Sequence, residues 1–299
     1  RGWHGVLVTR DTRGLRKKGN DVRLLVTNDD GIDGPGLHAL ARALVAAGHD
    51  VIVAAPLVDR SGSGAAIGRL HVDDHIDVEP RELAGLEGTT AFGVDGPPAL
   101  CVLASRLGGF GDPPDAVVSG INPGCNTGRA VLHSGTVGAA LTAVNFGVPG
   151  LAVSIDVRSD LVNEAVNAQG RVATAVDAAV EPCWETAGAL AVATVEWLAS
   201  TDVRTVVNLN VPDLALADVR GVRWGELAAL GTVRAAVVES GDGRLQMELR
   251  ATGEELPEGS DTALVREGYA SVTTIVGPRA TTATDVAAQI EQRAAIGVT

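Results

Sequence analysis

Residues 22–48 carry the feature that most limits how this chain can fold, which is a strand that leads through two adjacent carboxylates into a helix. The run from Val22 to Thr27 is short, apolar and rich in branched residues, which is the pattern of a buried strand. Asp29 and Asp30 follow it. Apolar residues then recur at helical spacing up to Gly48, which is placed to end the helix. The stretch is the first half of a βαβ unit.

The two carboxylates have two interpretations. In open α/β sheets, ligands bind outside the carboxyl ends of the strands, which is where Asp29 and Asp30 fall. Adjacent carboxylates repel each other unless a cation or hydrogen-bond donors compensate them. One interpretation is therefore a site for a hard cation, Mg²⁺ or Mn²⁺, with oxygen ligands. The other is a solvated Asp-Asp-Gly turn, which is a common turn composition.

Strand and helix patterns continue to alternate along the chain, which predicts an α/β fold with a mostly parallel sheet. Further strands are expected at 50–55, 115–119, 149–155 and 204–211, and helices at 99–107, 135–146, 187–198 and 281–294. Residues 70–78 are expected to form a strand or hairpin arm. After Pro212, residues 233–239 and 244–250 predict a hairpin, because an Asp-Gly turn joins them. We expect one domain over residues 21–299, with 213–275 as its hairpin and oligomerisation part.

Charge and cysteine content exclude several classes of protein. The net charge of −13 argues against a binder of polymeric nucleic acid or of membrane surfaces. No apolar run reaches the roughly 18 residues that a membrane helix needs. The three cysteines are scattered without metal or disulfide spacing, so a reducing cytoplasm is expected. Residues 1–20 hold six Lys or Arg and a single Asp, and they are expected to be a disordered basic extension.

Two more polar loops follow predicted strands. The loop at 57–68 contains Ser61 and Ser63 among glycines, and the loop at 120–128 contains Asn122 and Asn126. Loops of this kind offer hydroxyls, amide oxygens and backbone N–H groups to a ligand, although a Gly/Ser segment can also be a simple connector.

The segment Ser134-Gly135-Thr136 begins a predicted helix. Free N–H groups and the helix dipole at such an end favour an anion such as phosphate. An ordinary Ser/Thr N-cap is the alternative interpretation. The case for a ligand is that three polar loops each follow a strand of one sheet.

Taken together, these residues resemble the SurE family, the stationary-phase survival nucleotidases. The resemblance covers about residues 22–290, and its motifs occur in the same order. They are Val26-Thr27-Asn28-Asp29-Asp30-Gly31, Ala55-Pro56 with Arg60-Ser61-Gly62, Val118-Ser119-Gly120-Ile121-Asn122-Pro123-Gly124 with Asn126, Ser134-Gly135-Thr136-Val137-Gly138-Ala139-Ala140, Asn208-Leu209-Asn210-Val211-Pro212, Asp261-Thr262 and Gly268-Tyr269.

The resemblance implies a Rossmann-like core with a C-terminal hairpin exchanged between subunits, and hence a homodimer or homotetramer. It implies a metal-dependent phosphomonoesterase that hydrolyses nucleoside 5′- and 3′-monophosphates. By position, the ligands of one divalent metal ion would be Asp29, Asp30, Ser61 and Asn122. The phosphate-binding residues would be Asn126, Ser134, Gly135 and Thr136.

In the expected hydrolysis, Asp29 orients or deprotonates the attacking water, and His133 is a candidate donor of a proton to the leaving oxygen. Three alternatives stay open from the residues. The same site can serve another small phosphate ester. An Asp-nucleophile phosphatase of the haloacid-dehalogenase type would form an aspartyl-phosphate, but it expects an Asp-x-Asp spacing that is absent here. The third alternative is a non-catalytic nucleotide-binding module.

Overall fold

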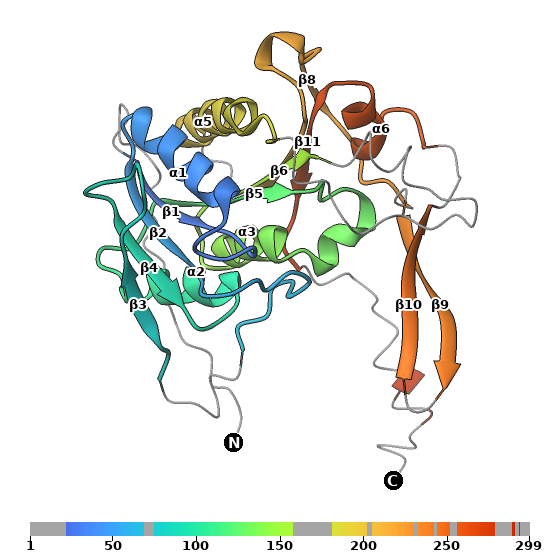
Figure 1. Ribbon diagram of the computed structural model, residues 1–299, viewed down its shortest axis with the longest axis horizontal. Helices are drawn as coiled ribbons and strands as arrows, with labels where there is room; N and C mark the ends of the chain where they lie inside the picture. The colour runs from blue at the N-terminus through green and yellow to red at the C-terminus, as the bar shows by residue number, and fades with distance from the viewer. Residues whose placement is uncertain are drawn as a thin grey trace.

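The computed structural model describes residues 22–68, 75–157, 181–201, 205–229, 233–241, 244–251 and 256–278, together with 289, 290 and 293. The predicted extension at 1–20, most of the predicted helix at 281–294 and the tip of the predicted hairpin turn lie outside these residues. Within the described part, nine strands form one sheet in the order β3-β4-β2-β1-β5-β6-β7-β11-β8. Helices cover both faces of the sheet (Figure 1).

The centre of the sheet is parallel, as the sequence predicts. Leu24 of β1 pairs with Val51 on one side and with Ala116 on the other. Parallel pairing continues outward through the strands that follow in the chain. The five central strands are β1 (Arg23–Thr27), β2 (Asp50–Pro56), β5 (Ala116–Pro123), β6 (Gly150–Asp156) and β7 (Val206–Pro212). Because they are parallel, their carboxyl ends lie at one edge, and the polar loops follow there.

Short strands complete both sides of the sheet. β4 (Thr90–Val94) runs parallel to β2, and β3 (Val78–Arg81) runs antiparallel to β4. On the other side, β11 (Ala270–Ile275) is antiparallel to β7, and β8 (Val222–Trp224) is parallel to β11. The pattern analysis did not predict β4 and β8. β8 is exposed along its whole length, so it carries no alternating apolar pattern.

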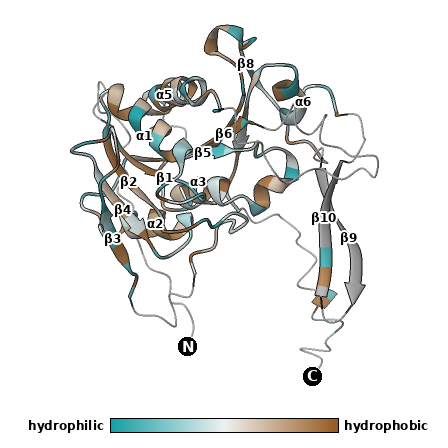
Figure 2. Ribbon diagram, viewed as in Figure 1, coloured by the Kyte–Doolittle hydropathy of each residue, from teal (hydrophilic) through white to brown (hydrophobic). Residues whose placement is uncertain are grey.

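Two pairs of helices bury the faces of the sheet. α1 (Pro35–Ala46) and α5 (Trp184–Ser200) pack with β1, β5 and β6 in one apolar cluster. α2 (Pro98–Arg106) and α3 (Gly135–Asn145) cover the opposite face. Figure 2 shows hydrophobic residues concentrated in the central strands, between these helices. A short helix, α6 (Asp261–Arg266), and the 3₁₀ turns η1 (Gly128–His133) and η2 (Leu216–Asp218) lie in the connections.

β5 is longer than predicted. The sequence predicts a strand that ends at Ser119 and a loop from Gly120 onward, but pairing with β6 resumes at Asn122, opposite Ser154. The register shifts between Ser119 and Asn122, and Gly120 has a φ of 134°. A Cβ at Gly120 would overlap the carbonyl oxygen of Val153, so only glycine lets the strand continue past this point.

The predicted hairpin is present. β9 (Val233–Gly241) and β10 (Arg244–Ala251) form an antiparallel two-stranded sheet of their own. The hairpin extends away from the nine-stranded sheet (Figure 1). Val237 and Leu245 on it are exposed, with 58% and 68% of their surface accessible. Its role in oligomerisation stays a prediction.

The close packing of α1 on β5 predicts that Gly36 cannot be replaced by a larger residue without loss of stability. A Cβ at this position would overlap the carbonyl oxygen of Ile121, so Gly36→Ala must push the helix away from the strand. We expect a loss of about 1–3 kcal/mol in the free energy of unfolding, measured by urea denaturation. Gly277→Ala is the matched control, because a Cβ there meets no atom within 4 Å. Equal midpoints for the two variants would contradict the prediction.

Candidate active site at the carboxyl ends of β1 and β5

Asp29 is buried at the end of β1 and faces the first turn of α3. Only 4% of its surface is accessible. Its Oδ1 accepts a hydrogen bond of 2.6 Å from the Thr136 hydroxyl. Burial raises the pKa of Asp29, while hydrogen bonds from the Thr136 hydroxyl and from the backbone N–H groups of Gly135 and Thr136 oppose that rise. The predicted catalytic carboxylate and the predicted phosphate-binding segment are therefore in direct contact.

The start of α3 has the sequence that this contact requires. Ser134 is the N-cap, and its Oγ accepts a hydrogen bond of 3.1 Å from the backbone N–H of Val137. The next residue must be glycine, because a Cβ at Gly135 would lie 2.7 Å from both Asp29 Oδ2 and Ser63 Oγ. Ser134 is therefore an ordinary N-cap, because its hydroxyl oxygen accepts a hydrogen bond from the helix backbone. The helix end still faces an acidic group, as an anion-binding end would.

Asp30 is half-buried beside this contact, and no described side chain donates a hydrogen bond to it. Its pKa is raised to about 7, first by burial and then by the negative charges of Asp29 and Asp59. A carboxylate in this position is costly unless a positive charge is bound next to it. The pair therefore has the charge that a hard cation would neutralise.

The loop after β2 contributes two serines in different positions. Ser61 is exposed, and its backbone N–H donates to Asp59 Oδ1 over 2.7 Å. The Ser63 hydroxyl is buried and has no hydrogen-bond partner among the described residues, and it lies against Gly135 and Asp29. Both serines are visible in the sequence, but only Ser61 was predicted as a ligand. Only a contact across the fold distinguishes the two, and the loop sequence does not contain that information.

The backbone fixes this loop to the rest of the site. The N–H of Arg60 donates to the carbonyl of Asp29 over 2.7 Å, and the N–H of Gly64 donates to the carbonyl of His133 over 3.2 Å. A Cβ at Gly138 of α3 would overlap the carbonyl of Gly64, so glycine permits the contact. The side chain of His133 is exposed.

Asn122 and Asn126 belong to the third loop. Asn122 Nδ2 donates to the carbonyl of Gly124 over 2.6 Å, which leaves its Oδ1 available to a ligand. Asn126 Nδ2 donates to Ser154 Oγ over 2.9 Å. The backbone of Asn126 is clamped by Asn210, whose Oδ1 accepts from its N–H over 2.8 Å and whose Nδ2 donates to its carbonyl over 3.1 Å.

Two further buried side chains hold this loop. Asn208 Nδ2 donates to the carbonyl of Asn126 over 2.8 Å. Asp261, which is fully buried, accepts from the N–H of Gly128 over 2.7 Å and from the N–H of Ala228 over 3.0 Å. Sequence reasoning assigned no role to these residues. Their signal was available, because asparagines at alternate positions of an apolar buried strand need hydrogen-bond partners.

The oxygen atoms at this edge fit a hard cation better than a soft one. Among the described residues, no three His, Cys, Asp or Glu side chains come together as metal ligands. The predicted ligand set contains two carboxylates, Asp29 and Asp30. Its other two predicted ligands are the hydroxyl of Ser61 and the amide oxygen of Asn122. Oxygen donors of this kind suit Mg²⁺ or Mn²⁺, which also keep several water ligands.

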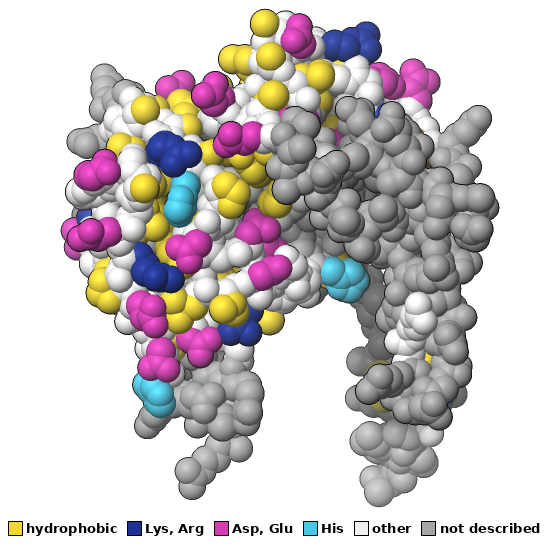
Figure 3. Space-filling view, viewed as in Figure 1, with side chains coloured by type: hydrophobic (Ala, Val, Ile, Leu, Met, Phe, Trp, Pro, Cys, Tyr) yellow, Lys and Arg dark blue, Asp and Glu magenta, His cyan; other side chains and the backbone are white. Residues whose placement is uncertain are grey.

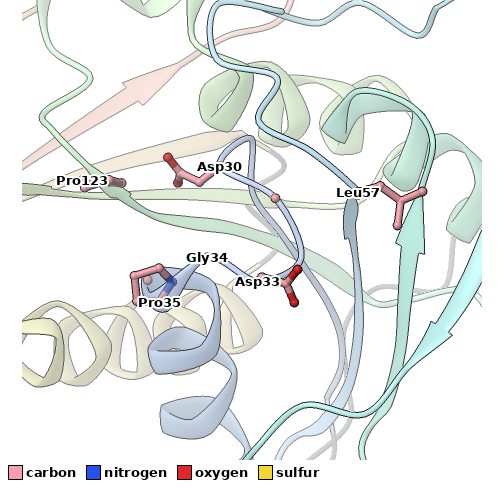
Figure 4. A pocket seen from close by; sticks show the side chains of 8 residues that line it. Asp30, Asp33, Gly34, Pro35, Leu57 and Pro123 are labelled. Atoms are coloured by element: carbon pink, nitrogen blue, oxygen red, sulfur yellow. The ribbon is translucent and has the colours of Figure 1, made fainter.

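A cavity of about 290 Å³ opens beside Asp30. Figure 4 shows Asp30, Asp33, Gly34 and Pro35 on the β1–α1 connection, with Leu57 and Pro123 at its sides. The lining is completed by Gly31 and Gly36. Of the predicted metal ligands, Asp30 lines the cavity, so the cavity adjoins the predicted metal site.

Comparison with known proteins decides the family. The profile described as Survival protein SurE matches residues 24–233. The chain belongs to the SurE family. A 5′-nucleotidase SurE from Xanthomonas campestris pv. campestris (strain B100) is 36% identical over 259 residues, which is 85% of this chain and 89% of that protein. A 5′-nucleotidase SurE from Nitratidesulfovibrio vulgaris is 38% identical over 200 residues, 66% of this chain and 64% of that protein.

A solved structure supports the same conclusion for the fold. The crystal structure of the SurE protein from Aquifex aeolicus matches with a TM-score of 0.66 and 26% identity, covering 91% of this chain and 99% of that one. The α/β prediction is confirmed by this match and by the sheet order.

The surface agrees with the composition. Figure 3 shows that acidic side chains outnumber basic ones on the visible face, and the chain carries a net charge of −13. No helix in the described part of the chain is long and apolar enough to cross a lipid bilayer.

The raised pKa of Asp30 predicts a pH-dependent stability of the metal-free protein. Its ordinary value is 3.8 and its folded value is about 7. The stabilising contribution of the neutral carboxyl is therefore complete below about pH 4 and is lost as the pH rises through about 7. In the presence of a chelator, Asp30→Asn should raise the melting temperature at about pH 8, by roughly 2–4 °C for each kcal/mol recovered. The gain should vanish near pH 4.

Asp218→Asn is the control, because Asp218 is exposed on η2. Thermal unfolding followed by circular dichroism at both pH values measures the difference. A destabilised Asp30→Asn variant at about pH 8 under chelation would contradict the assignment of a charge cost to this residue.

Proposed function

We propose that this protein is a metal-dependent phosphomonoesterase that hydrolyses nucleoside 5′- and 3′-monophosphates to nucleoside and phosphate. The observation that carries the proposal is the buried carboxylate of Asp29, which is hydrogen-bonded to the first turn of α3 and lies next to the half-buried Asp30. We infer that the carboxylates bind a cation and that the adjacent helix end favours an anion, since a phosphate monoester bound to a cation needs both. The 5′-nucleotidase names of the relatives support the nucleotide as substrate.

Asp29, Asp30, Ser61 and Asn122 would hold one divalent metal ion. When bound, Mg²⁺ or Mn²⁺ supplies a Lewis acid for the phosphoryl oxygen and lowers the pKa of a bound water. The chain itself contributes orientation. The Thr136 hydroxyl fixes one oxygen of Asp29, so the other oxygen, Oδ2, is directed at the space beside Gly135 and Ser63. This orientation supports a role for Asp29 in orienting or deprotonating the attacking water.

Asn126, Ser134, Gly135 and Thr136 would bind the phosphoryl group. The N–H groups of Gly135 and Thr136 already hydrogen-bond Asp29, and that of Val137 bonds Ser134 Oγ, so the dipole of the helix end is what would stabilise the developing negative charge. Rigid placement matters for this task, and the clamp on Asn126 from Asn208 and Asn210 provides it. His133 lies at the end of η1, immediately before this segment, and remains the candidate donor of a proton to the leaving oxygen.

The first test removes the carboxylates. Asp29→Asn and Asp30→Ala should each abolish hydrolysis of nucleoside monophosphates, because each loses a ligand that contributes several kcal/mol of transition-state stabilisation. The wild type should lose activity in EDTA and regain it with Mn²⁺ or Mg²⁺. The measurement is phosphate release at saturating metal, with circular dichroism to show that the fold survives. Asp218→Asn should keep normal kcat.

Nearly normal kcat in either Asp29→Asn or Asp30→Ala would reject the site assignment. Nucleotide binding without turnover in the wild type would favour a non-catalytic module.

We also propose a homodimer or homotetramer in the cytoplasm, assembled through the β9–β10 hairpin. A two-stranded hairpin is marginally stable alone in water, and this one presents Val237 and Leu245 to solvent. A second subunit would cover them in a closed symmetric interface. Light scattering of the intact protein should give at least twice the chain mass of 30.4 kDa. Deleting residues 233–250 should give monomers or aggregates. A single intact species at the chain mass, at micromolar concentration, would refute the proposal.

A further inference from the structure

The cavity beside Asp30 has an unusual charge distribution. Its described lining residues include two carboxylates, Asp30 and Asp33, and no cationic side chain. Leu57, Pro35 and Pro123 give it apolar walls, and the remaining wall is glycine backbone. The glycine at position 34 is required, because a Cβ there would lie 2.8 Å from Asn28 Nδ2. The cavity is therefore a small space with apolar sides, in which Asp33 is a charged group outside the predicted metal ligands.

Asp33 also forms an ion pair with a cation that does not line the cavity. Its Oδ2 pairs with Nη2 of Arg81, on β3, over 3.4 Å. Arg81 does not line the cavity, whereas Asp33 does. A molecule in the cavity therefore contacts the carboxylate of Asp33 and not the guanidinium of Arg81. Arg60, the cation of the neighbouring loop, is already paired with Asp95 over 2.8 Å.

We propose that this cavity receives the leaving group of the substrate, and that Asp33 makes it select uncharged, hydroxyl-bearing leaving groups over anionic ones. The inference rests on the proposed phosphomonoesterase function. A substrate whose phosphate lies at Asp29, Asp30 and α3 places its ester oxygen and the group beyond it in the adjoining space. At about 290 Å³ that space suits part of a mononucleoside.

The chemistry of Asp33 explains the selection. A carboxylate accepts hydrogen bonds and donates none when ionised, so it favours the hydroxyls of a sugar. It repels a second phosphate or a carboxylate on the leaving group. A cation bound by Asp29 and Asp30 would neutralise those two groups, and the charge of Asp33 would then dominate the outer part of the cavity. This carboxylate lies outside the metal-ligand set, so its removal tests specificity separately from catalysis.

The test compares a nucleoside 5′-monophosphate with the 3′,5′-bisphosphate of the same nucleoside. Whichever phosphate of the bisphosphate is cleaved, the leaving group carries the other. The measured quantity is the ratio of kcat/KM for the monophosphate to that for the bisphosphate. Asp33→Asn should lower the ratio roughly fivefold, the effect of one charge across a partly solvated gap. Asp33→Ala should lower it further, because it also releases Arg81 from its pair.

Arg81→Ala should change the ratio in the opposite direction, since it leaves the charge of Asp33 uncompensated. Asp112→Asn is the matched control, because it removes an exposed carboxylate that pairs with Arg23 at the other end of β1. Added salt should reduce the ratio in the wild type and less in Asp33→Asn. A ratio that stays the same in both Asp33 variants, while both substrates are turned over, overturns the cavity assignment alone. A wild type that hydrolyses neither substrate with Mg²⁺ or Mn²⁺ overturns the proposed function as well.

Discussion

The contact between Asp29 and the first turn of α3 is the interaction on which the site depends. It joins the end of the central strand to a helix more than a hundred positions later in the chain, through the 2.6 Å hydrogen bond from Thr136. A buried carboxylate without donors would be neutral or absent, and a helix end without an acceptor would leave N–H groups unsatisfied. The helix end therefore supplies hydrogen-bond donors to the carboxylate, and the carboxylate supplies the acceptor for the helix end. No described side chain donates a hydrogen bond to Asp30, and burial together with the charges of Asp29 and Asp59 raises its pKa to about 7.

Glycines make the close approaches around this contact possible. Gly135 lets α3 meet Asp29, and Gly138 lets the loop after β2 lie on the same helix. In each case the atom that a Cβ would overlap belongs to another segment of the site, so the glycine is required by packing between segments. The two glycines of the Ser-Gly-Thr-Val-Gly motif are thus explained by close packing between segments, in addition to the position of the motif at a helix end.

The fold was largely predictable from sequence, and the physical reason is periodicity. Buried parallel strands and amphipathic helices leave strong patterns, so the elements around β1, α1, β2, α3 and β7 were predicted within a few residues. β4 and β8 were missed, because short strands at the sides of a sheet carry little pattern. The end of β5 was predicted too early, since Gly120 is a usual sign of a loop and here lets the strand pass Val153 closely.

The site was predictable in part. Carboxylates that follow a buried strand can be recognised in the sequence as candidate site residues. The residues that hold the site in place cannot be recognised in the same way. Asn208 and Asn210 act only on the backbone of Asn126, and Ser63 becomes distinct from Ser61 only when α3 is packed against the loop. Asp33 is the clearest case. In the sequence it is one more acidic residue in a turn. In the fold it forms an ion pair with Arg81 of β3, the strand at one side of the sheet. The carboxylates of the candidate site lie in one sequence motif, whereas the pair proposed to select the leaving group forms only when β3 is brought next to the β1–α1 connection.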